Sequence, residues 1–121
     1  MIEAGDKAPA VSVTSSDGRS VNLGSPGELL VLYFYPKDDT SGCTREAQDF
    51  TALAPDFARA GVRVVGISRD PMRSHEKFIG KYSLAVPLAS FPEGDYRLDI
   101  ELTDKTTNKT LKRDVSFTVV P

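Results

Sequence analysis

The only cysteine of the chain lies where protein structure favours a reactive thiolate. Cys43 follows the hydroxyl residue Thr40, and Pro36 closes the apolar run before them. The residues after Cys43 are typical of a helix, which places the cysteine in or just before the first helical turn. Unpaired backbone N–H groups and the positive end of the helix dipole favour an anion there over a neutral thiol. We therefore expect a nucleophilic thiol at residue 43, with the Thr40 hydroxyl placed to bond it.

Two apolar runs predict the strands that position this cysteine. Leu29–Tyr35 is apolar or aromatic throughout, which predicts a strand buried on both faces and ended by Pro36. Val62–Ser68 predicts a second central strand. Near the N-terminus, apolar residues alternate with polar ones on either side of the turn Ser16-Asp17-Gly18, which predicts a small hairpin.

Two helices are expected to connect these strands. The first begins near Cys43, is kinked or restarted at Pro55, and ends at Gly61. The second follows Asp70-Pro71, which has the form of a helix cap and first residue. Its expected inner face includes His75, which we interpret as a packed or capped side chain and not as an acid or base. The alternation of strand and helix predicts an α/β fold with parallel strands.

The C-terminal residues change in character. After the turn signal at 91–94, apolar and polar residues alternate over 96–103, which predicts a half-buried strand. Residues 111–119 supply the returning strand. The sequence therefore predicts that a long antiparallel hairpin ends the chain, with no helical period after Tyr82.

Composition restricts the functional classes. The chain has 121 residues, 40% of them hydrophobic, which suits one domain with an ordinary core. A net charge of −2 without a basic patch argues against a nucleic-acid partner. No apolar run approaches the ~20 residues that span a bilayer, and no secretory signal is recognisable, so we expect a cytoplasmic location and no membrane partner. The lone His75 and the pair Asp38-Asp39 do not suit a metal site, and we expect no cofactor.

Several segments, in order, resemble the peroxiredoxins, the thiol peroxidases with a thioredoxin-like fold. The likeness is closest to the bacterioferritin-comigratory (PrxQ-type) branch and runs from about residue 3 to about residue 90. The segments that carry it are Gly5-Asp6-Lys7-Ala8-Pro9, Ser16-Asp17-Gly18, Val31 to Thr40, Gly42-Cys43-Thr44, Val65-Gly66-Ile67-Ser68 and Ser74-His75-Glu76-Lys77-Phe78.

The resemblance implies a site and a reaction. Cys43 would attack a hydroperoxide and become a sulfenic acid, Thr40 would bond the thiolate or the peroxide, and Pro36 would shield the sulfur from bulk water. Gln48 stands where many relatives carry a second, resolving cysteine. An external thiol reductant such as thioredoxin or glutaredoxin is therefore implied, with hydrogen peroxide or small alkyl hydroperoxides as substrates.

The chain departs from this family after about residue 90. The family closes with further strands and a helix, and one late strand carries an arginine that holds the thiolate. No matching motif is present, although Arg97, and less readily Arg113, could substitute. The sequence of residues 92–98 is similar to that of the last hairpin of an extracellular β-sandwich domain.

We therefore interpret the chain as a hybrid: a single domain, 1–121, in which a peroxiredoxin-like portion, 1–90, is completed by a hairpin of different origin, 91–121. The missing final helix would leave an apolar sheet face uncovered, and we expect either a homodimer through this face or a weakly packed molecule. Two alternatives stay open: a catalytically silent scaffold or binding module, and a secreted sandwich-like adhesion module, which the helical middle opposes.

Overall fold

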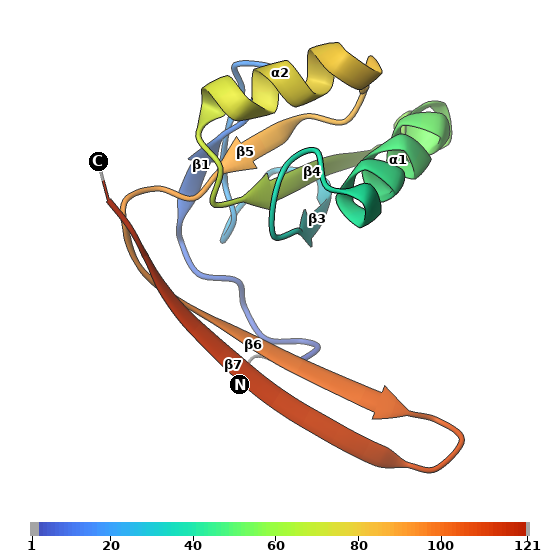
Figure 1. Cartoon of the computed structure of the whole chain (residues 1–121), viewed down its shortest axis with the longest axis vertical. Helices are drawn as coiled ribbons and strands as arrows, with labels where there is room; N and C mark the ends of the chain where they lie inside the picture. Colours follow the sequence, from blue (N-terminus) through green and yellow to red (C-terminus); the bar gives the residue numbers. More distant parts are fainter. Residues whose placement is uncertain (1–2, 121) are drawn as a thin grey trace. The chain divides into compact units, whose positions relative to one another are not determined.

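A computed structural model describes residues 3–120 of the chain as two compact units. The larger unit, Ala8–Phe91, holds five strands and both helices. The smaller unit combines the C-terminal hairpin with the first residues of the chain. Figure 1 shows the elements of each unit.

A parallel three-stranded sheet forms the centre of the larger unit. Its order is β3 (Leu29–Phe34), β4 (Val62–Ser68), β5 (Leu88–Ser90). The predicted parallel pairing is confirmed, with Val31 opposite Val64 and Phe34 opposite Ile67. The short strand β5 is an addition that the sequence analysis did not anticipate.

The expectation that β3 is buried on both faces is wrong. This strand pairs with β4 on one side only, so it forms an edge of the sheet as described. Leu29 is 68% exposed and Phe34 is 50% exposed. An unbroken apolar run cannot distinguish a central strand from an edge strand, because both have the same composition.

The helices lie in the predicted places. Helix α1 (Ser41–Arg59) runs through Pro55 without a restart, and Gly61 follows its end with a φ of +70°. Helix α2 (Met72–Tyr82) begins after Pro71 and buries His75 and Phe78 on its inner face. Ser83 ends it in a left-handed conformation.

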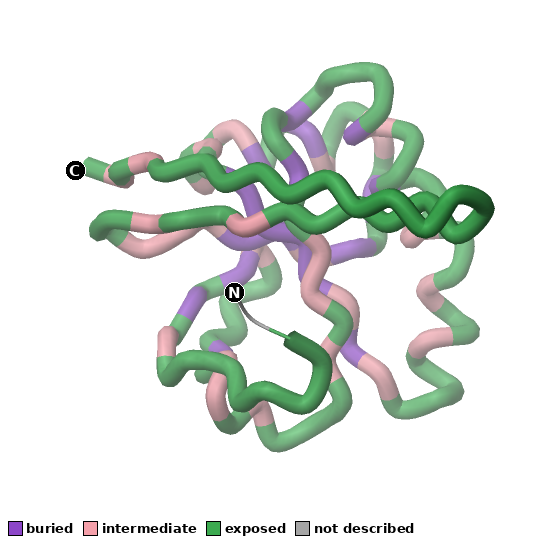
Figure 2. The backbone as a smooth tube through the Cα atoms, turned by 90° about the horizontal axis from the view of Figure 1, so that it is seen from below, coloured by how far each residue is buried: buried purple, intermediate pink, exposed green. Residues whose placement is uncertain are grey.

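Each sheet face carries its own apolar cluster. The buried residues are coloured purple in Figure 2. On the face covered by α1 and α2, Cys43 and Ala47 pack with Tyr35, Phe78 and Leu88. The other face is covered by the predicted N-terminal hairpin, β1 (Ser12–Thr14) and β2 (Ser20–Asn22), whose central valines pack on β4. The cysteine is thus held between the sheet and the two helices.

The C-terminal hairpin is a sheet of its own. Strands β6 (Gly94–Asp104) and β7 (Lys109–Val119) pair along their whole length, as predicted, but neither joins the central sheet. The expectation of a half-buried face is wrong, since Leu102 and Leu111 are 61% and 47% exposed. Alternation in the sequence predicts which side chains share one face of a strand. It does not predict whether another element packs on that face.

Candidate active site

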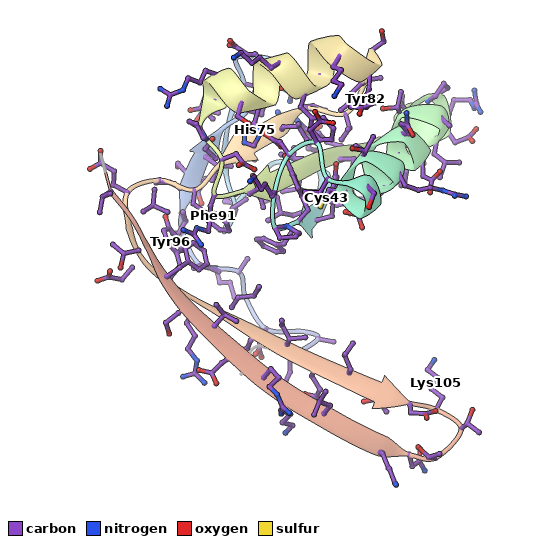
Figure 3. The ribbon with its side chains drawn as sticks, viewed as in Figure 1. Cys43, His75, Tyr82, Phe91, Tyr96 and Lys105 are labelled. Atoms are coloured by element: carbon purple, nitrogen blue, oxygen red, sulfur yellow. The ribbon has the colours of Figure 1, made fainter. Side chains whose placement is uncertain are left out.

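Cys43 lies in the first turn of α1, on the face that packs against the sheet (Figure 3). The first intrahelical hydrogen bond runs from the amide of Thr44 to the carbonyl of Thr40, at 2.8 Å. Within residues 3–120, the amides of Ser41, Gly42 and Cys43 donate to no protein acceptor. The predicted position of the cysteine among unpaired helical amides is therefore present. The residue is nevertheless 9% exposed, so the thiol sits mostly inside the apolar cluster.

Thr40 and Pro36 stand in the loop that enters α1. Thr40 is the N-cap residue, but its hydroxyl makes no capping bond and donates instead to the carbonyl of Lys37, at 3.0 Å. The donor proton of this hydroxyl is thus engaged away from the sulfur of Cys43. Pro36 lies two residues after the end of β3 and is exposed. Pro36, Thr40 and Cys43 therefore lie on one short segment, formed by the loop before α1 and the first turn of that helix.

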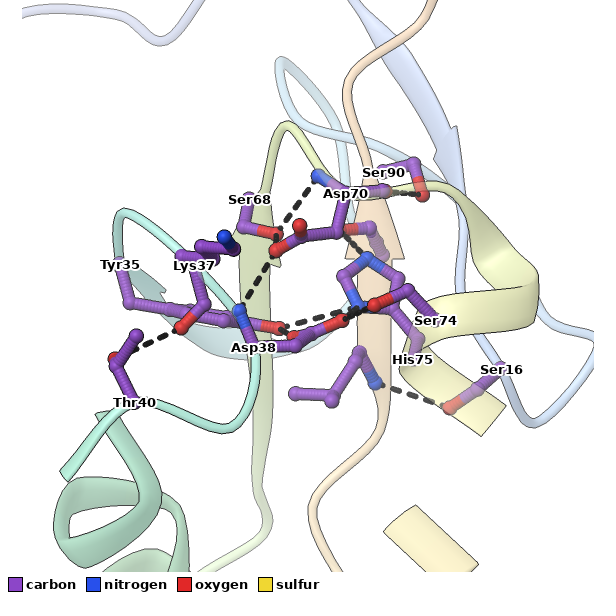
Figure 4. A network of polar contacts seen from close by, with 12 residues as sticks. Ser16, Tyr35, Lys37, Asp38, Thr40, Ser68, Asp70, Ser74, His75 and Ser90 are labelled. Atoms are coloured by element: carbon purple, nitrogen blue, oxygen red, sulfur yellow. Dashed lines mark hydrogen bonds and ion pairs between the residues drawn. The ribbon is translucent and has the colours of Figure 1, made fainter. Parts of the chain in front are cut away.

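A buried polar network anchors the same loop, as Figure 4 shows. Asp38 is buried and accepts a hydrogen bond from the Tyr35 hydroxyl at 2.6 Å and another from the Ser74 hydroxyl at 2.8 Å. The backbone amide of Asp38 donates to the carboxylate of Asp70 at 2.8 Å. The loop is therefore tied to β3, to α2 and to the turn after β4.

His75 completes this network from helix α2. The ring is 0% exposed. Its Nδ1 lies 2.8 Å from a carboxylate oxygen of Asp38, and its Nε2 lies 3.0 Å from the carbonyl oxygen of Ala89. The interpretation of His75 as a packed side chain is confirmed, and it is packed against a charge.

These contacts set the ionisation of the groups around the loop. Burial alone would raise the pKa of Asp38, but hydrogen bonds from His75, Tyr35 and Ser74 outweigh it and lower that pKa. Burial and the hydrogen bond to Asp38 raise the pKa of Tyr35. Asp38 is therefore a carboxylate and Tyr35 a neutral phenol.

A second aspartate ties the same loop to α2 at the surface. Asp39 has a φ of +58°. Its carboxylate accepts bonds from the Lys81 ammonium and the Tyr82 hydroxyl, both at 2.7 Å. Hydrogen bonds from Lys81 and Tyr82 lower the pKa of Asp39. This contact is exposed, whereas that of Asp38 is buried.

The two arginines considered as substitutes belong to the C-terminal hairpin. The Arg97 Nε lies 2.9 Å from Asp99 and 3.6 Å from Asp114. A guanidinium N–H of Arg113 donates to the carbonyl of Lys112 at 2.8 Å. Both arginines are thus engaged within the hairpin, and neither is assigned a role at Cys43.

The sequence analysis did not foresee the pairing of Asp38 with His75. The two residues are 37 positions apart, and neither stands in a motif with a stated partner. One signal was available: Asp38 and Asp70 each follow a strand, and the carboxyl ends of parallel strands meet at one edge of a sheet. Polar residues just beyond those ends are the candidates for contact.

Two further features concern ligands and membranes. In the part of the chain that the structure describes, no group of three or more His, Cys, Asp or Glu side chains is arranged to hold a metal ion. Over the same residues, neither helix has the length and apolar character needed to cross a membrane.

Comparison with known proteins identifies the relatives of this chain. Peroxiredoxin Bcp of Xanthomonas campestris is 51% identical over 72 residues, which are 60% of this chain and 44% of that protein. A structure of the X. campestris bacterioferritin comigratory protein, described as having alkyl peroxide reduction activity, is 41% identical with a TM-score of 0.63, over 72% of this chain and 59% of that one. The chain spans about half the length of such relatives.

A yeast mitochondrial one-cysteine peroxiredoxin, whose thiol is resolved by glutathione and thioredoxin systems, is 26% identical with a TM-score of 0.66, over 74% of this chain and 46% of that one. The thioredoxin-like α/β fold predicted from the sequence is confirmed by these neighbours. The model of the AhpC/TSA family matches residues 4–115, which extends into the C-terminal hairpin. The chain belongs to the AhpC/TSA family, and its relatives are the peroxiredoxins of the Bcp and PrxQ type.

Proposed function

We propose that this chain is a one-cysteine thiol peroxidase that reduces hydrogen peroxide or small alkyl hydroperoxides through Cys43. The observation that carries the proposal is the position of Cys43 in the first turn of α1, where three successive backbone amides have no protein acceptor within residues 3–120. Such amides stabilise a thiolate and the negative charge that develops when a peroxide bond breaks.

The proposed first step is a displacement at oxygen. The thiolate of Cys43 attacks one peroxide oxygen, a sulfur–oxygen bond forms, and the oxygen–oxygen bond breaks. The leaving oxygen takes a proton and departs as water or an alcohol, which leaves a sulfenic acid on Cys43. Thr40, whose hydroxyl oxygen keeps free lone pairs, and Pro36, on the same loop, are the proposed neighbours of the reacting atoms.

The proposed second step needs a thiol from outside the chain. Cys43 is the only cysteine, and Gln48 is exposed on α1. An external thiol would attack the sulfenic acid, release water and form a mixed disulfide, and a second thiol would restore Cys43. Thioredoxin, glutaredoxin or a small thiol fits this role, and the cycle suits a reducing compartment such as the cytoplasm.

Coupled turnover tests this function. Hydrogen peroxide should drive oxidation of NADPH through thioredoxin reductase and thioredoxin, or through glutathione reductase and glutaredoxin, in proportion to the concentration of this chain. The matched control is Cys43→Ser, which keeps the size of the side chain and should abolish turnover. Turnover that survives in Cys43→Ser, or that is missing with every reductant, would contradict the proposal.

A catalytically silent scaffold is the second candidate, and a specific observation favours it. Cys43 is only 9% exposed within an apolar cluster, and the Thr40 hydroxyl donates to Lys37. A buried cysteine in such surroundings commonly acts as a small apolar residue. Sulfenic acid formation at Cys43 no faster than at a free thiol would select this candidate.

We also propose that the hairpin after about residue 90 has an origin different from that of the preceding residues. What supports this is the change in sequence pattern after about residue 90 and the place of the hairpin in a compact unit other than that of Ala8–Phe91. The test is activity of a protein in which residues 92–121 are replaced by the corresponding C-terminal part of a Bcp relative. A hybrid origin predicts a gain in peroxidase activity, and a loss would oppose it.

A further inference from the structure

The buried pair formed by Asp38 and His75 has no part in the proposed chemistry of Cys43. Chains of this size seldom bury a histidine and a carboxylate together unless both are hydrogen-bonded. His75 is 0% exposed and Asp38 is 7% exposed. The pair sits between the loop that enters α1 and the inner face of α2.

The contacts of the ring define where its protons are. The carbonyl oxygen of Ala89 can only accept, so the Nε2 of His75, 3.0 Å away, must carry a proton. On the other side, the Tyr35 hydroxyl and the Ser74 hydroxyl both donate to the Asp38 carboxylate. That carboxylate is an acceptor, so the Nδ1 of His75 must also carry a proton. A ring with two protonated nitrogens is an imidazolium.

The charged groups around the His75 ring are consistent with a positive charge on the ring. The titratable groups that face it are Tyr35 at the end of β3 and Asp38 in the next loop. Strand β5 offers only the Ala89 carbonyl, and Asp70 binds the amide of Asp38. Among the described contacts of the ring there is one carboxylate and no second cation, so the positive charge of the ring is paired with the negative charge of Asp38.

This ion pair is connected to the apolar cluster that surrounds Cys43. Tyr35, which bonds Asp38, and Phe78, one turn after His75 on α2, belong to the same apolar cluster as Cys43. The loop from Pro36 to Thr40 leads directly into the turn that carries the cysteine. If Asp38 lost its partner, the loop and both rings would lose their common anchor.

We infer that His75 is a positioning residue: as a buried imidazolium it holds Asp38, and through Asp38 it fixes the loop before α1, so that Tyr35 and Phe78 stay packed around Cys43. The inference rests on the proposed function in that Cys43 is taken as the reacting thiol. Its test uses no peroxide and no reductant, so it stands or fails independently of peroxidase activity.

Nuclear magnetic resonance tests the charge directly. His75 is the only histidine, so its ring signals are unambiguous. At pH 7.5, where an imidazole free in water is mostly neutral, both ring nitrogens should show shifts of protonated nitrogen. A ring with one protonated and one unprotonated nitrogen at this pH overturns the inference.

Alkylation of Cys43 by iodoacetamide tests whether this packing limits access to the sulfur. Asp38→Asn and His75→Gln keep the approximate size of each side chain and remove one charge, and each should raise the alkylation rate by about tenfold or more, because a buried charged partner left unpaired favours opening. The matched control is Asp39→Asn, which removes the adjacent aspartate from an exposed contact with α2 and should change the rate by less than about twofold.

Amide exchange of β4 distinguishes local opening from global unfolding. Protection of Val62–Ser68 should stay close to that of the parent while Cys43 becomes reactive. Unchanged alkylation in Asp38→Asn and His75→Gln, or equal acceleration in Asp39→Asn, overturns the inference. If both charge variants fail to fold, the ring signals of the parent protein still decide it.

Discussion

At the scale of single residues, the site depends on which buried polar atoms have partners. Tyr33 and Tyr35 lie on the same face of β3 and its end, with ring centroids 5.8 Å apart. The Tyr35 hydroxyl donates to Asp38, whereas the Tyr33 hydroxyl is buried and has no partner among the described residues. Burial raises the pKa of both phenols, with the hydrogen bond to Asp38 adding to it for Tyr35. The buried tyrosine hydroxyl is therefore hydrogen-bonded at position 35 and unpaired at position 33.

This contrast predicts a matched pair of stability effects. Tyr33→Phe should leave the free energy of unfolding unchanged or raise it by up to about 1 kcal/mol, because it removes an unpaired buried hydroxyl. Tyr35→Phe should lower it by about 1–3 kcal/mol, because it takes a donor from the Asp38 carboxylate. Urea denaturation measures both. Equal effects of the two substitutions would contradict the assignment of partners.

Asp38 also predicts how stability depends on pH. Hydrogen bonds from His75, Tyr35 and Ser74 lower its pKa in the folded state, despite burial, so the unfolded chain binds this proton more readily. Its contribution is therefore complete above about pH 4 and is lost as the pH falls through the folded-state value. The decline in thermal midpoint between about pH 5 and pH 3 should be smaller in Asp38→Asn than in the parent. Parallel declines would show that Asp38 contributes nothing to acid sensitivity.

At the scale of elements, close approach of β3, β4 and β5 depends on one glycine. A Cβ at Gly66 in β4 would lie 2.6 Å from the Tyr33 ring and 2.9 Å from Leu88. A Cβ added at Gly80 in α2 would meet no neighbouring heavy atom within 4 Å. The strands can pack their aromatic residues against the helices only because position 66 has no side chain.

Two glycine-to-alanine substitutions should therefore change the free energy of unfolding in opposite directions. Gly66→Ala should lower the free energy of unfolding by about 1–3 kcal/mol through overpacking. Gly80→Ala should raise it by about 0.5–1 kcal/mol, because alanine is the better helix former and meets nothing. Thermal denaturation followed by circular dichroism is the measurement. Stabilisation by Gly66→Ala would show that Tyr33 and Leu88 do not pack over β4.

The sequence predicted the positions of the helices and strands well, and the burial of their side chains poorly. Periodicity and end signals located β4, both helices and the C-terminal hairpin, since these are local properties of the chain. The exposure of Leu29 and Leu102 depends on which strands pair, and pairing is not encoded in the local pattern. At the site, Cys43, Thr40 and Pro36 were found because they share one segment. The Asp38–His75 contact joins distant segments and required the structure.

At the scale of the whole molecule, the hairpin leaves an apolar surface exposed. Leu102 and Leu111 are paired across the strands, and Leu98 pairs with Val115 on the same face. All four are at least 37% exposed. A two-stranded hairpin is at best marginally stable alone in water, so covering this face would stabilise it.

We expect this surface to drive self-association of the intact chain. Replacing both Leu102 and Leu111 by Thr, which keeps strand propensity, should shift a dimer toward the monomer in analytical ultracentrifugation. Glu101→Gln, on the polar face of β6, should leave the association constant unchanged. A parent chain that is monomeric over the micromolar range would contradict the expectation, as would a double variant that associates like the parent.

The central claim is that Cys43 is a peroxide-reactive thiol. Its most direct test is a single-turnover experiment, in which substoichiometric hydrogen peroxide is mixed with the reduced chain and the sulfenic acid is trapped with dimedone and counted by intact-mass spectrometry. We predict that Cys43 is modified far faster than free cysteine in the same solution. Equal rates would contradict the account.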